Sequence, residues 1–218
     1  MFSIRPSKKL SGQYQDLKYR VQRAMQGRGN LGFVLTFVSY EHNEGVTSVA
    51  ANFAATLAQD IKKRVLLIDA NLASPSLQGL LEENPRKAGD AAAAHIEEPN
   101  LLWRITSVNK NLDIGMVHNT QNNPVQIFES SWFNNRLRSI RDRYGCVIID
   151  SPPIKDPSGA LVLTTKADAV ILVIEAGRVR REVLQRAVTV LTETGAQFLG
   201  VVLNKRRYPI PRFIYKFL

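Results

Sequence analysis

The amino-acid sequence predicts an α/β fold, a single domain built on a mostly parallel β-sheet with helices on both faces. Short apolar runs that suit buried strands recur along the chain, and helical patterns separate them. Two of these runs end in an aspartate, as strands do when they lead into a binding crevice. Strands that alternate with helices form a parallel sheet covered on both sides. A length of 218 residues is compatible with one domain of this class.

The first strand is predicted over residues 32–40, a continuous apolar run of the kind found in fully buried strands. A polar turn follows, and apolar residues then recur at helical spacing from Val49 to Leu57. The run 64–69 predicts the second strand. It ends at Asp69, where the carboxyl end of a parallel strand would meet a ligand.

The middle of the chain is less regular. Residues 82–111 combine acidic, alanine and asparagine stretches, and we expect a loop region with one short helix near 91–94. The run 112–117 then predicts a short strand. The pattern over 124–140 opens with proline and predicts one amphipathic helix whose aromatic stripe faces the core.

Three further strands are predicted at 146–150, 169–174 and 198–203, with helical stretches between them. The first of these contains the one cysteine of the chain, Cys146, which we expect to be a buried structural thiol. A single cysteine excludes a disulfide within the chain. The same strand ends at Asp150, which repeats the arrangement seen at the end of the second strand.

The turn after the first strand resembles a phosphate-binding loop that lacks its lysine. Such a loop needs glycines, a lysine for the phosphate charge and a hydroxyl for Mg²⁺. Gly45 and the hydroxyl of Thr47 are present, but Val46 stands where lysine is expected and Asn43 where glycine is usual. Glu44 adds negative charge beside a bound polyphosphate. The candidate nucleotide-contacting residues in this loop are Asn43, Glu44, Gly45, Val46, Thr47 and Ser48.

Asp69 and Asp150 should reach the same edge of a parallel sheet, beside the loop. With Thr47 they form a candidate Mg²⁺ ligand set, and the two aspartates are candidate catalytic residues in vestigial form. A purely structural alternative is that both aspartates cap following helices and that Thr47 is an ordinary helix-start residue. The loop and the two strand ends together predict a P-loop NTPase fold.

Positive charge is concentrated at the two ends of the chain, although the formal net charge is +10 overall. We therefore divide the chain into a basic N-terminal helical arm (1–30), a P-loop NTPase-like domain (31–204) and a basic, aromatic C-terminal tail (205–218). The ends are either solvated tails or contacts for an anionic membrane surface, and the tail could also fold back on the domain. The sequence has neither a membrane-spanning apolar run nor a signal-peptide pattern, so we expect a cytoplasmic protein.

Longer segments around these positions carry a resemblance that covers nearly the whole chain. They are 44–54, similar to a Walker A loop and helix, 65–77, similar to a Walker A′ segment, 144–153, similar to a Walker B strand, and 200–205. Together they resemble the bacterial tyrosine kinases of capsule and exopolysaccharide synthesis, the CpsD/CapB type within the MinD/ParA branch of P-loop proteins. The resemblance implies Mg-ATP as the cofactor and places Asn204 where the family contacts adenine.

The sequence departs from this family at the residues that carry out catalysis. Val46 replaces the Walker A lysine, and Asn71 replaces the second Walker A′ aspartate, which serves metal and base chemistry in the family. Only Tyr208 and Tyr215 remain where the kinases carry a tyrosine cluster for autophosphorylation. The resemblance therefore implies a degenerate member that binds Mg-ATP or ADP weakly or not at all and has lost enzymatic activity.

The leading hypothesis is a regulator or scaffold in capsule or exopolysaccharide biosynthesis and export. It would act with a membrane-embedded polysaccharide co-polymerase (a chain-length determinant) and be held by that partner at the inner face of the cell membrane. Homo-oligomerisation stays open, since the family's oligomerisation pattern is altered to Gly12, Gln15 and Lys18. One alternative is a weakly active ATPase or tyrosine autokinase in which Lys205 or Arg206 supplies the missing positive charge. Another is a ParA-like nucleic-acid-associated protein, although no DNA-reading motif supports it.

Overall fold

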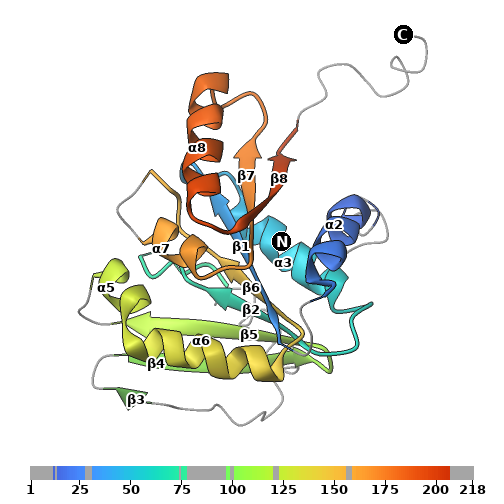
Figure 1. Cartoon of the computed structure of the whole chain (residues 1–218), viewed down its shortest axis with the longest axis vertical. Helices are drawn as coiled ribbons and strands as arrows, with labels where there is room; N and C mark the ends of the chain where they lie inside the picture. Colours follow the sequence, from blue (N-terminus) through green and yellow to red (C-terminus); the bar gives the residue numbers. More distant parts are fainter. Residues whose placement is uncertain are drawn as a thin grey trace.

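A mostly parallel β-sheet organises the chain, as the sequence predicts. The computed structural model describes residues 12, 14–27, 31–73, 75–77, 97–98, 101–119, 123–155 and 159–206. Eight strands lie in the order β3-β4-β5-β2-β6-β1-β7-β8 (Figure 1). Their bounds are β1 (Phe33–Ser39), β2 (Val65–Asp69), β3 (Glu97–Glu98), β4 (Leu101–Asn109), β5 (Leu112–Asn119), β6 (Cys146–Asp150), β7 (Ala169–Glu175) and β8 (Gln197–Asn204). All six strands predicted from apolar runs are present.

The six strands from β5 to β8 in this order run parallel, and β4 at one edge pairs antiparallel with both β5 and β3. Every residue of β1, β2 and β6 is buried, which explains their uninterrupted apolar sequences. Cys146 is fully buried at the start of β6, and burial raises the pKa of its thiol, so the prediction of a structural thiol is confirmed. The register pairs Asp69 with Asp150, which brings both strand ends to one edge of the sheet.

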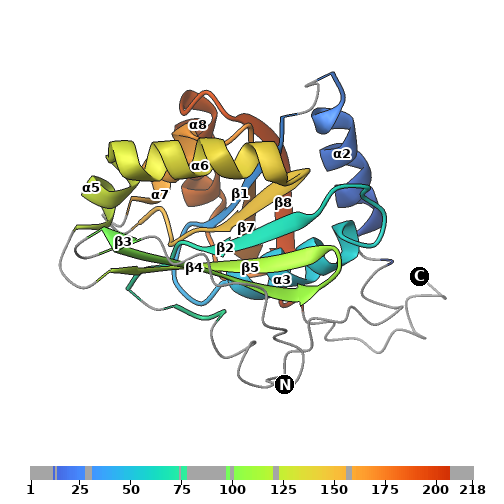
Figure 2. The ribbon, with the colours of Figure 1, turned by 90° about the horizontal axis from the view of Figure 1, so that it is seen from below.

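Helices cover both faces of the sheet. Figure 2 shows α5, α6, α7 and α8 on one side and α3 on the other, with α2 beside α3. Val21 of α2 is fully buried in the core under α3, and Tyr14 contacts Phe53 edge to face, with 6.3 Å between ring centroids. The helix bounds are α2 (Gln15–Met25), α3 (Val46–Leu57), α5 (Pro124–Glu129), α6 (Ser131–Arg143), α7 (Ala160–Thr165) and α8 (Arg181–Glu193).

The predicted loop over 82–111 is wrong for residues 101–109, which form β4 and pair with β5. Trp103 of β4 is 1% exposed and lies under α6, with its ring centroid 6.1 Å from that of Trp132. Ile105 lies on the same side, while Arg104 between them is exposed. This alternation is the pattern of a strand with one covered face, and it is weaker than the continuous runs of the central strands. The helix predicted near 91–94 lies outside the described residues.

The single helix predicted over 124–140 is in fact two helices, α5 and α6, separated at Ser130. Ser130 has an extended backbone (ψ 150°), and its hydroxyl accepts a hydrogen bond from the backbone N–H of Phe133 at 3.1 Å. A serine that caps the first turn of a helix marks a new start. The apolar periodicity continues through this break, which is why the sequence pattern concealed it.

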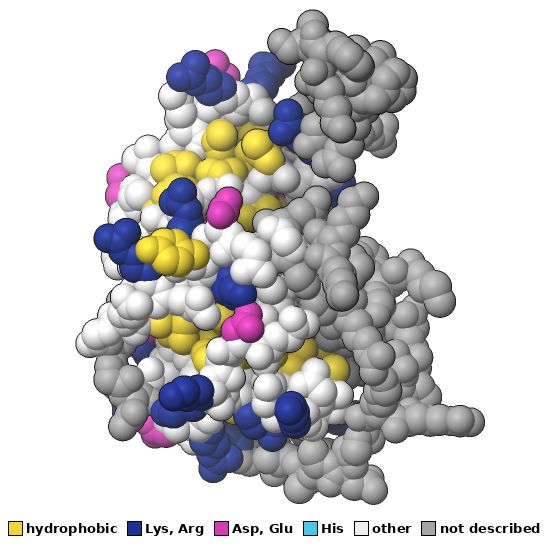
Figure 3. Space-filling model, turned by 90° about the vertical axis from the view of Figure 1, so that its right-hand side faces the viewer, with side chains coloured by type: hydrophobic (Ala, Val, Ile, Leu, Met, Phe, Trp, Pro, Cys, Tyr) yellow, Lys and Arg dark blue, Asp and Glu magenta, His cyan; other side chains and the backbone are white. Residues whose placement is uncertain are grey.

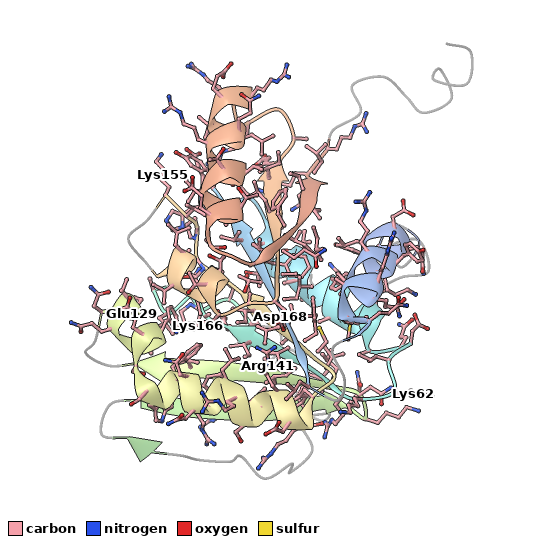
Figure 4. All side chains as sticks on the ribbon, in the orientation of Figure 1. Lys62, Glu129, Arg141, Lys155, Lys166 and Asp168 are labelled. Carbon is pink, nitrogen blue, oxygen red and sulfur yellow. The ribbon has the colours of Figure 1, made fainter. Side chains whose placement is uncertain are left out.

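An ion pair fixes the amino-terminal end of the sheet. Arg141 of α6 donates to both carboxylate oxygens of Asp168, at 2.8 and 2.6 Å, and Figure 4 shows the two residues close together. Asp168 also accepts a hydrogen bond from the backbone N–H of Val34 at 2.8 Å. Both bonds come from one guanidinium nitrogen, Nη2. Because the two side chains are 25% and 10% exposed, this ion pair is largely shielded from water. It holds α6 against the start of β1, at the end of the sheet opposite Asp150.

Candidate functional site

The turn between β1 and α3 has the backbone conformation of a phosphate-binding loop. Gly45 is the N-cap residue of α3 and has a left-handed backbone, with φ of 85°. Asn43 is also left-handed, with φ of 62°, and asparagine is among the few non-glycine residues that adopt this region readily. A Cβ atom on Gly45 would collide with the side-chain amide of Asn204, which would have to move away from the loop. Asn43 therefore supplies a conformation that glycine usually supplies.

Glu44 stabilises this loop through hydrogen bonds to its buried carboxylate. The residue is fully buried, and its carboxylate accepts backbone hydrogen bonds from Tyr40 (3.0 Å), Glu41 (2.8 Å) and Glu175 (3.1 Å). A buried carboxylate that accepts three N–H groups is satisfied, and its charge is partly offset by their dipoles. The sequence suggested that Glu44 would repel a polyphosphate, but the structure turns its carboxylate into the loop. Glu41 is paired as well, with Lys155 at 3.1 Å (labelled in Figure 4).

The end of β8 adds two further contacts to the loop. The side-chain amide of Asn204 donates to the backbone carbonyl of Glu44 at 2.8 Å. The next residue, Lys205, has a left-handed backbone with φ of 52°, and its ammonium donates to the backbone carbonyl of Asn43 and to the carboxylate of Glu175 at 3.2 Å. The loop is thus attached to the ends of both β7 and β8.

A cavity of about 360 Å³ lies in front of the loop and the N-terminus of α3. The predicted loop residues 43–48 all line it, as does Asp150, whereas Asp69 and Asn204 are not among its lining residues. Lys205 lines it too, which the sequence suggested only as a conditional substitute for the missing lysine. The lining residues are Ser39, His42, Asn43, Glu44, Gly45, Val46, Thr47, Ser48, Ala51, Asn52, Asn71, Ser76, Asp150, Ser151, Pro153 and Lys205.

Asp150 is the carboxyl group at the cavity whose pKa the fold shifts most. It is 1% exposed, and burial raises its pKa to about 8, with a further upward contribution from the charge of Asp69. A hydrogen bond with the Thr47 side chain acts in the opposite direction. One carboxylate oxygen, Oδ2, is buried without a hydrogen-bond partner among the described residues. An orphaned acidic oxygen beside a threonine hydroxyl suits a bound divalent cation.

Asp69 lies next to Asp150 on the neighbouring strand, but its carboxylate is engaged by backbone. It accepts hydrogen bonds from the N–H groups of Asn71 (3.1 Å), Ser76 (2.8 Å) and Leu77 (2.9 Å). These bonds fold the segment after β2 over the strand end. Of the predicted Mg²⁺ ligands, the structure thus places Thr47 and Asp150 at the cavity and uses Asp69 to hold the segment beside it. Among the described residues, no three His, Cys, Asp or Glu side chains cluster as a metal site.

Val46 occupies the first position of α3 and is 8% exposed. Its side chain belongs to the core cluster between α3 and the sheet, although it also borders the cavity. A valine has neither the length nor the charge to reach a phosphate group. Among the described residues that line the cavity, Lys205 is the only Lys or Arg.

The face of the molecule that is drawn in Figure 3 carries mixed charge. On the face in Figure 3, Lys and Arg side chains of the described residues lie in separate small groups among apolar and acidic ones. Residues 207–218, most of the tail that we expect to contact a membrane or to fold back, are outside the described residues, as are residues 1–11. In the part of the chain that the structure describes, no helix is long and apolar enough to cross a membrane.

The glycine-capped loop, the parallel strand order and the aspartate at the end of β6 define the chain as a P-loop NTPase fold. No family model matches it. It is 31% identical over 173 residues to the tyrosine-protein kinase CpsD of Streptococcus pneumoniae serotype 4, which covers 79% of this chain and 75% of that protein. The chain belongs to this family of bacterial tyrosine-protein kinases.

Two further similarities agree with this assignment. The chain is 26% identical over 186 residues to the succinoglycan biosynthesis transport protein ExoP of Rhizobium meliloti, spanning 81% of this chain but 23% of that protein. The crystal structure of the VpsO kinase domain is also similar, at 26% identity and a TM-score of 0.68, over 90% of this chain and 94% of that domain. The sequence-based resemblance to tyrosine kinases of polysaccharide synthesis is thereby confirmed at the level of the family.

Proposed function

We propose that this protein is a member of the tyrosine-kinase family that no longer transfers phosphate and acts as a regulator or scaffold in capsule or exopolysaccharide biosynthesis and export. The observation that carries this proposal is Val46, a buried apolar side chain at the first turn of α3, where a phosphate-binding lysine is expected. Loss of one preorganised charge at a reacting phosphate typically costs ~3 kcal/mol of transition-state stabilisation, or about two orders of magnitude in rate.

The Walker A′ side of the cavity supports the same conclusion. Asn71 lines the cavity with an amide, which cannot take a proton from an attacking hydroxyl. Asp69 could act as a base only by giving up hydrogen bonds to three backbone N–H groups, one of which belongs to Asn71 itself. Among the described residues at the cavity, Asp150 is the acidic residue that has an unpartnered oxygen, and an oxygen of this kind suits a bound cation.

The proposed pathway and partner are supported by the relatives of the chain. Its named relatives include a succinoglycan biosynthesis transport protein, and a domain like this one makes up about a quarter of that protein. We propose that this chain acts beside a membrane-embedded polysaccharide co-polymerase, at the inner face of the cell membrane. It would influence how much polysaccharide is made, or how long the polymer grows, through binding rather than phosphorylation.

A weakly active autokinase is the second candidate. The observation in its favour is the retained loop, in which Asn43 and Gly45 keep the left-handed conformations and a cavity remains in front of α3. In this case Thr47 and Asp150 would hold the magnesium ion of Mg-ATP, and turnover would be low without the Walker A lysine.

Two measurements separate these functions. Purified protein is incubated with Mg-ATP and probed for phosphotyrosine, and a related active kinase serves as the positive control. Our proposal expects no phosphotyrosine, and a clear signal returns the chain to the active kinases. In the producing organism, deletion of the gene should change the amount or length of the polysaccharide. An unchanged polymer would remove the regulatory proposal.

A further inference from the structure

Lys205 lies where a nucleotide-binding loop would gain most from a positive charge. Its side chain crosses from the end of β8 to the loop, and its ammonium reaches the backbone carbonyl of Asn43. On the way, its Cε atom passes 3.9 Å from the position that a Cβ would take on Gly45, the N-cap residue of α3. The ammonium therefore lies beside the N-terminus of the helix that borders the cavity.

An anion in the cavity would add to the stabilisation of this placement. The N-terminus of a helix carries a partial positive charge, and α3 has no acidic residue in its first turn and no side-chain cap. A lysine ammonium beside it adds a second positive group. Lys205 also has a left-handed backbone, a conformation that costs a lysine ~1 kcal/mol. Two positive groups that converge on one cavity are both stabilised when an anion enters it.

The carboxylate that now pairs with Lys205 can release it at low cost. Glu175 lies 3.2 Å from the Lys205 ammonium and 3.3 Å from the Arg178 guanidinium. Both pairs are partly exposed to solvent, so each contributes little on its own. If Lys205 turns toward an anion, Glu175 still has Arg178 as a partner. Lysine has a flexible stem that allows this exchange.

We propose that Lys205 is the phosphate-binding cation of this cavity and takes over, from the opposite side of the loop, the charge that Val46 cannot supply. The ligand is a nucleoside diphosphate or triphosphate, whose phosphate groups would contact the Lys205 ammonium and the backbone N–H groups at the start of α3. This inference deepens the proposed function, since it makes nucleotide binding without phosphoryl transfer the property that the regulator retains.

The test is calorimetric titration of the full chain with Mg-ADP, with adenosine as the phosphate-free comparison. Lys205→Gln keeps the length and a hydrogen-bond donor but removes the charge, and it should weaken ADP binding ~10-fold. Glu175→Gln frees Lys205 from its carboxylate partner and should strengthen ADP binding ~3-fold. Arg206→Gln is the matched control, because it makes the same charge change at an exposed neighbour that does not line the cavity.

Opposite changes in ADP affinity for Lys205→Gln and Glu175→Gln would exclude a merely structural role of Lys205. If Lys205 only clamped the loop to β7, both Lys205→Gln and Glu175→Gln would loosen the loop and weaken ADP binding together, which would overturn the proposal. Equal affinity of wild type and Lys205→Gln would overturn it too, as would the absence of any ADP binding by wild type at millimolar concentration. Thermal unfolding checks that each variant is folded, and Lys205→Arg, which keeps the charge, should retain most of the affinity.

These outcomes are separate from those of the proposed function. Phosphotyrosine on the wild-type protein would refute the loss of phosphoryl transfer and leave the role of Lys205 standing. A flat ADP titration would refute the role of Lys205 and leave a scaffold that works without nucleotide.

Discussion

Replacing Asp150 by asparagine should make this protein more stable at neutral and alkaline pH. The carboxyl group is 1% exposed, and burial with the nearby charge of Asp69 raises its pKa from 3.8 to about 8. Below about pH 4 the folded and unfolded chains both hold the proton. Between about pH 4 and about pH 8 the unfolded chain releases it while the folded chain keeps it, so the free energy of unfolding falls as pH rises.

The size of the effect follows from the width of that window. One proton of difference corresponds to ~1.4 kcal/mol per pH unit, so an interval of about four units gives an upper limit of ~5 kcal/mol. Asparagine has nearly the same shape and does not ionise. We therefore expect Asp150→Asn to exceed wild type in stability by ~2 kcal/mol or more at about pH 8, and to lose most of the pH dependence.

The assay is urea unfolding with a chelator present, at several pH values from about 5 to about 8. Asp142→Asn on the exposed side of α6 is the control, because it removes the same charge without burial. It should follow the wild-type curve. Equal stability of Asp150→Asn and wild type at about pH 8, or an unchanged slope, would show that the Asp150 carboxyl is not held protonated by the fold.

Three other substitutions test the site and its support. Val46→Lys restores an ammonium at the cavity and should tighten Mg-ADP binding by ~10-fold or more in calorimetry, whereas no gain would mean that the loop does not present its N–H groups to phosphate. Gly45→Ala places a Cβ against Asn204 at a left-handed position and should cost ~2 kcal/mol in urea unfolding; a cost below ~0.5 kcal/mol would contradict the tight contact. Arg141→Leu removes the guanidinium that pairs with the shielded carboxylate of Asp168 and should cost ~3 kcal/mol, with an exposed arginine such as Arg138 as the matched control.

The central strands could be predicted because their burial on both faces leaves a continuous apolar sequence. β4 could not, since its apolar sequence is interrupted, with an exposed Arg104 between Trp103 and Ile105, which pack under α6. The division between α5 and α6 could not be predicted from the sequence for a related reason. The apolar positions keep their period across Ser130, and only the hydrogen bond to the serine hydroxyl shows where one helix stops and the next begins.

Within the site, the sequence predicted what depends on topology and missed what depends on side-chain direction. Parallel strands end at one edge, so the neighbourhood of Asp69 and Asp150 was predictable and is observed in the register. Nothing in the spacing showed that the Asp69 carboxylate would turn to N–H groups up to eight residues further along the chain. The contact of Lys205 with the loop was equally hidden, because it requires a left-handed backbone at a lysine.

The pattern of departures from the family has a physical explanation in these contacts. Glu44, Gly45 and Asn204 hold the loop whether or not a ligand is bound, through three backbone bonds to a buried carboxylate, a close approach and an amide bond to a carbonyl. Losing the Glu44 carboxylate or the Asn204 amide leaves polar groups of the loop unsatisfied, at ~1–3 kcal/mol each. The side chains at positions 46 and 71 take part in none of these contacts, so their replacement does not remove them. A chain can therefore lose catalysis and keep the cavity, and the charge of Lys205 decides whether that cavity still binds a nucleotide.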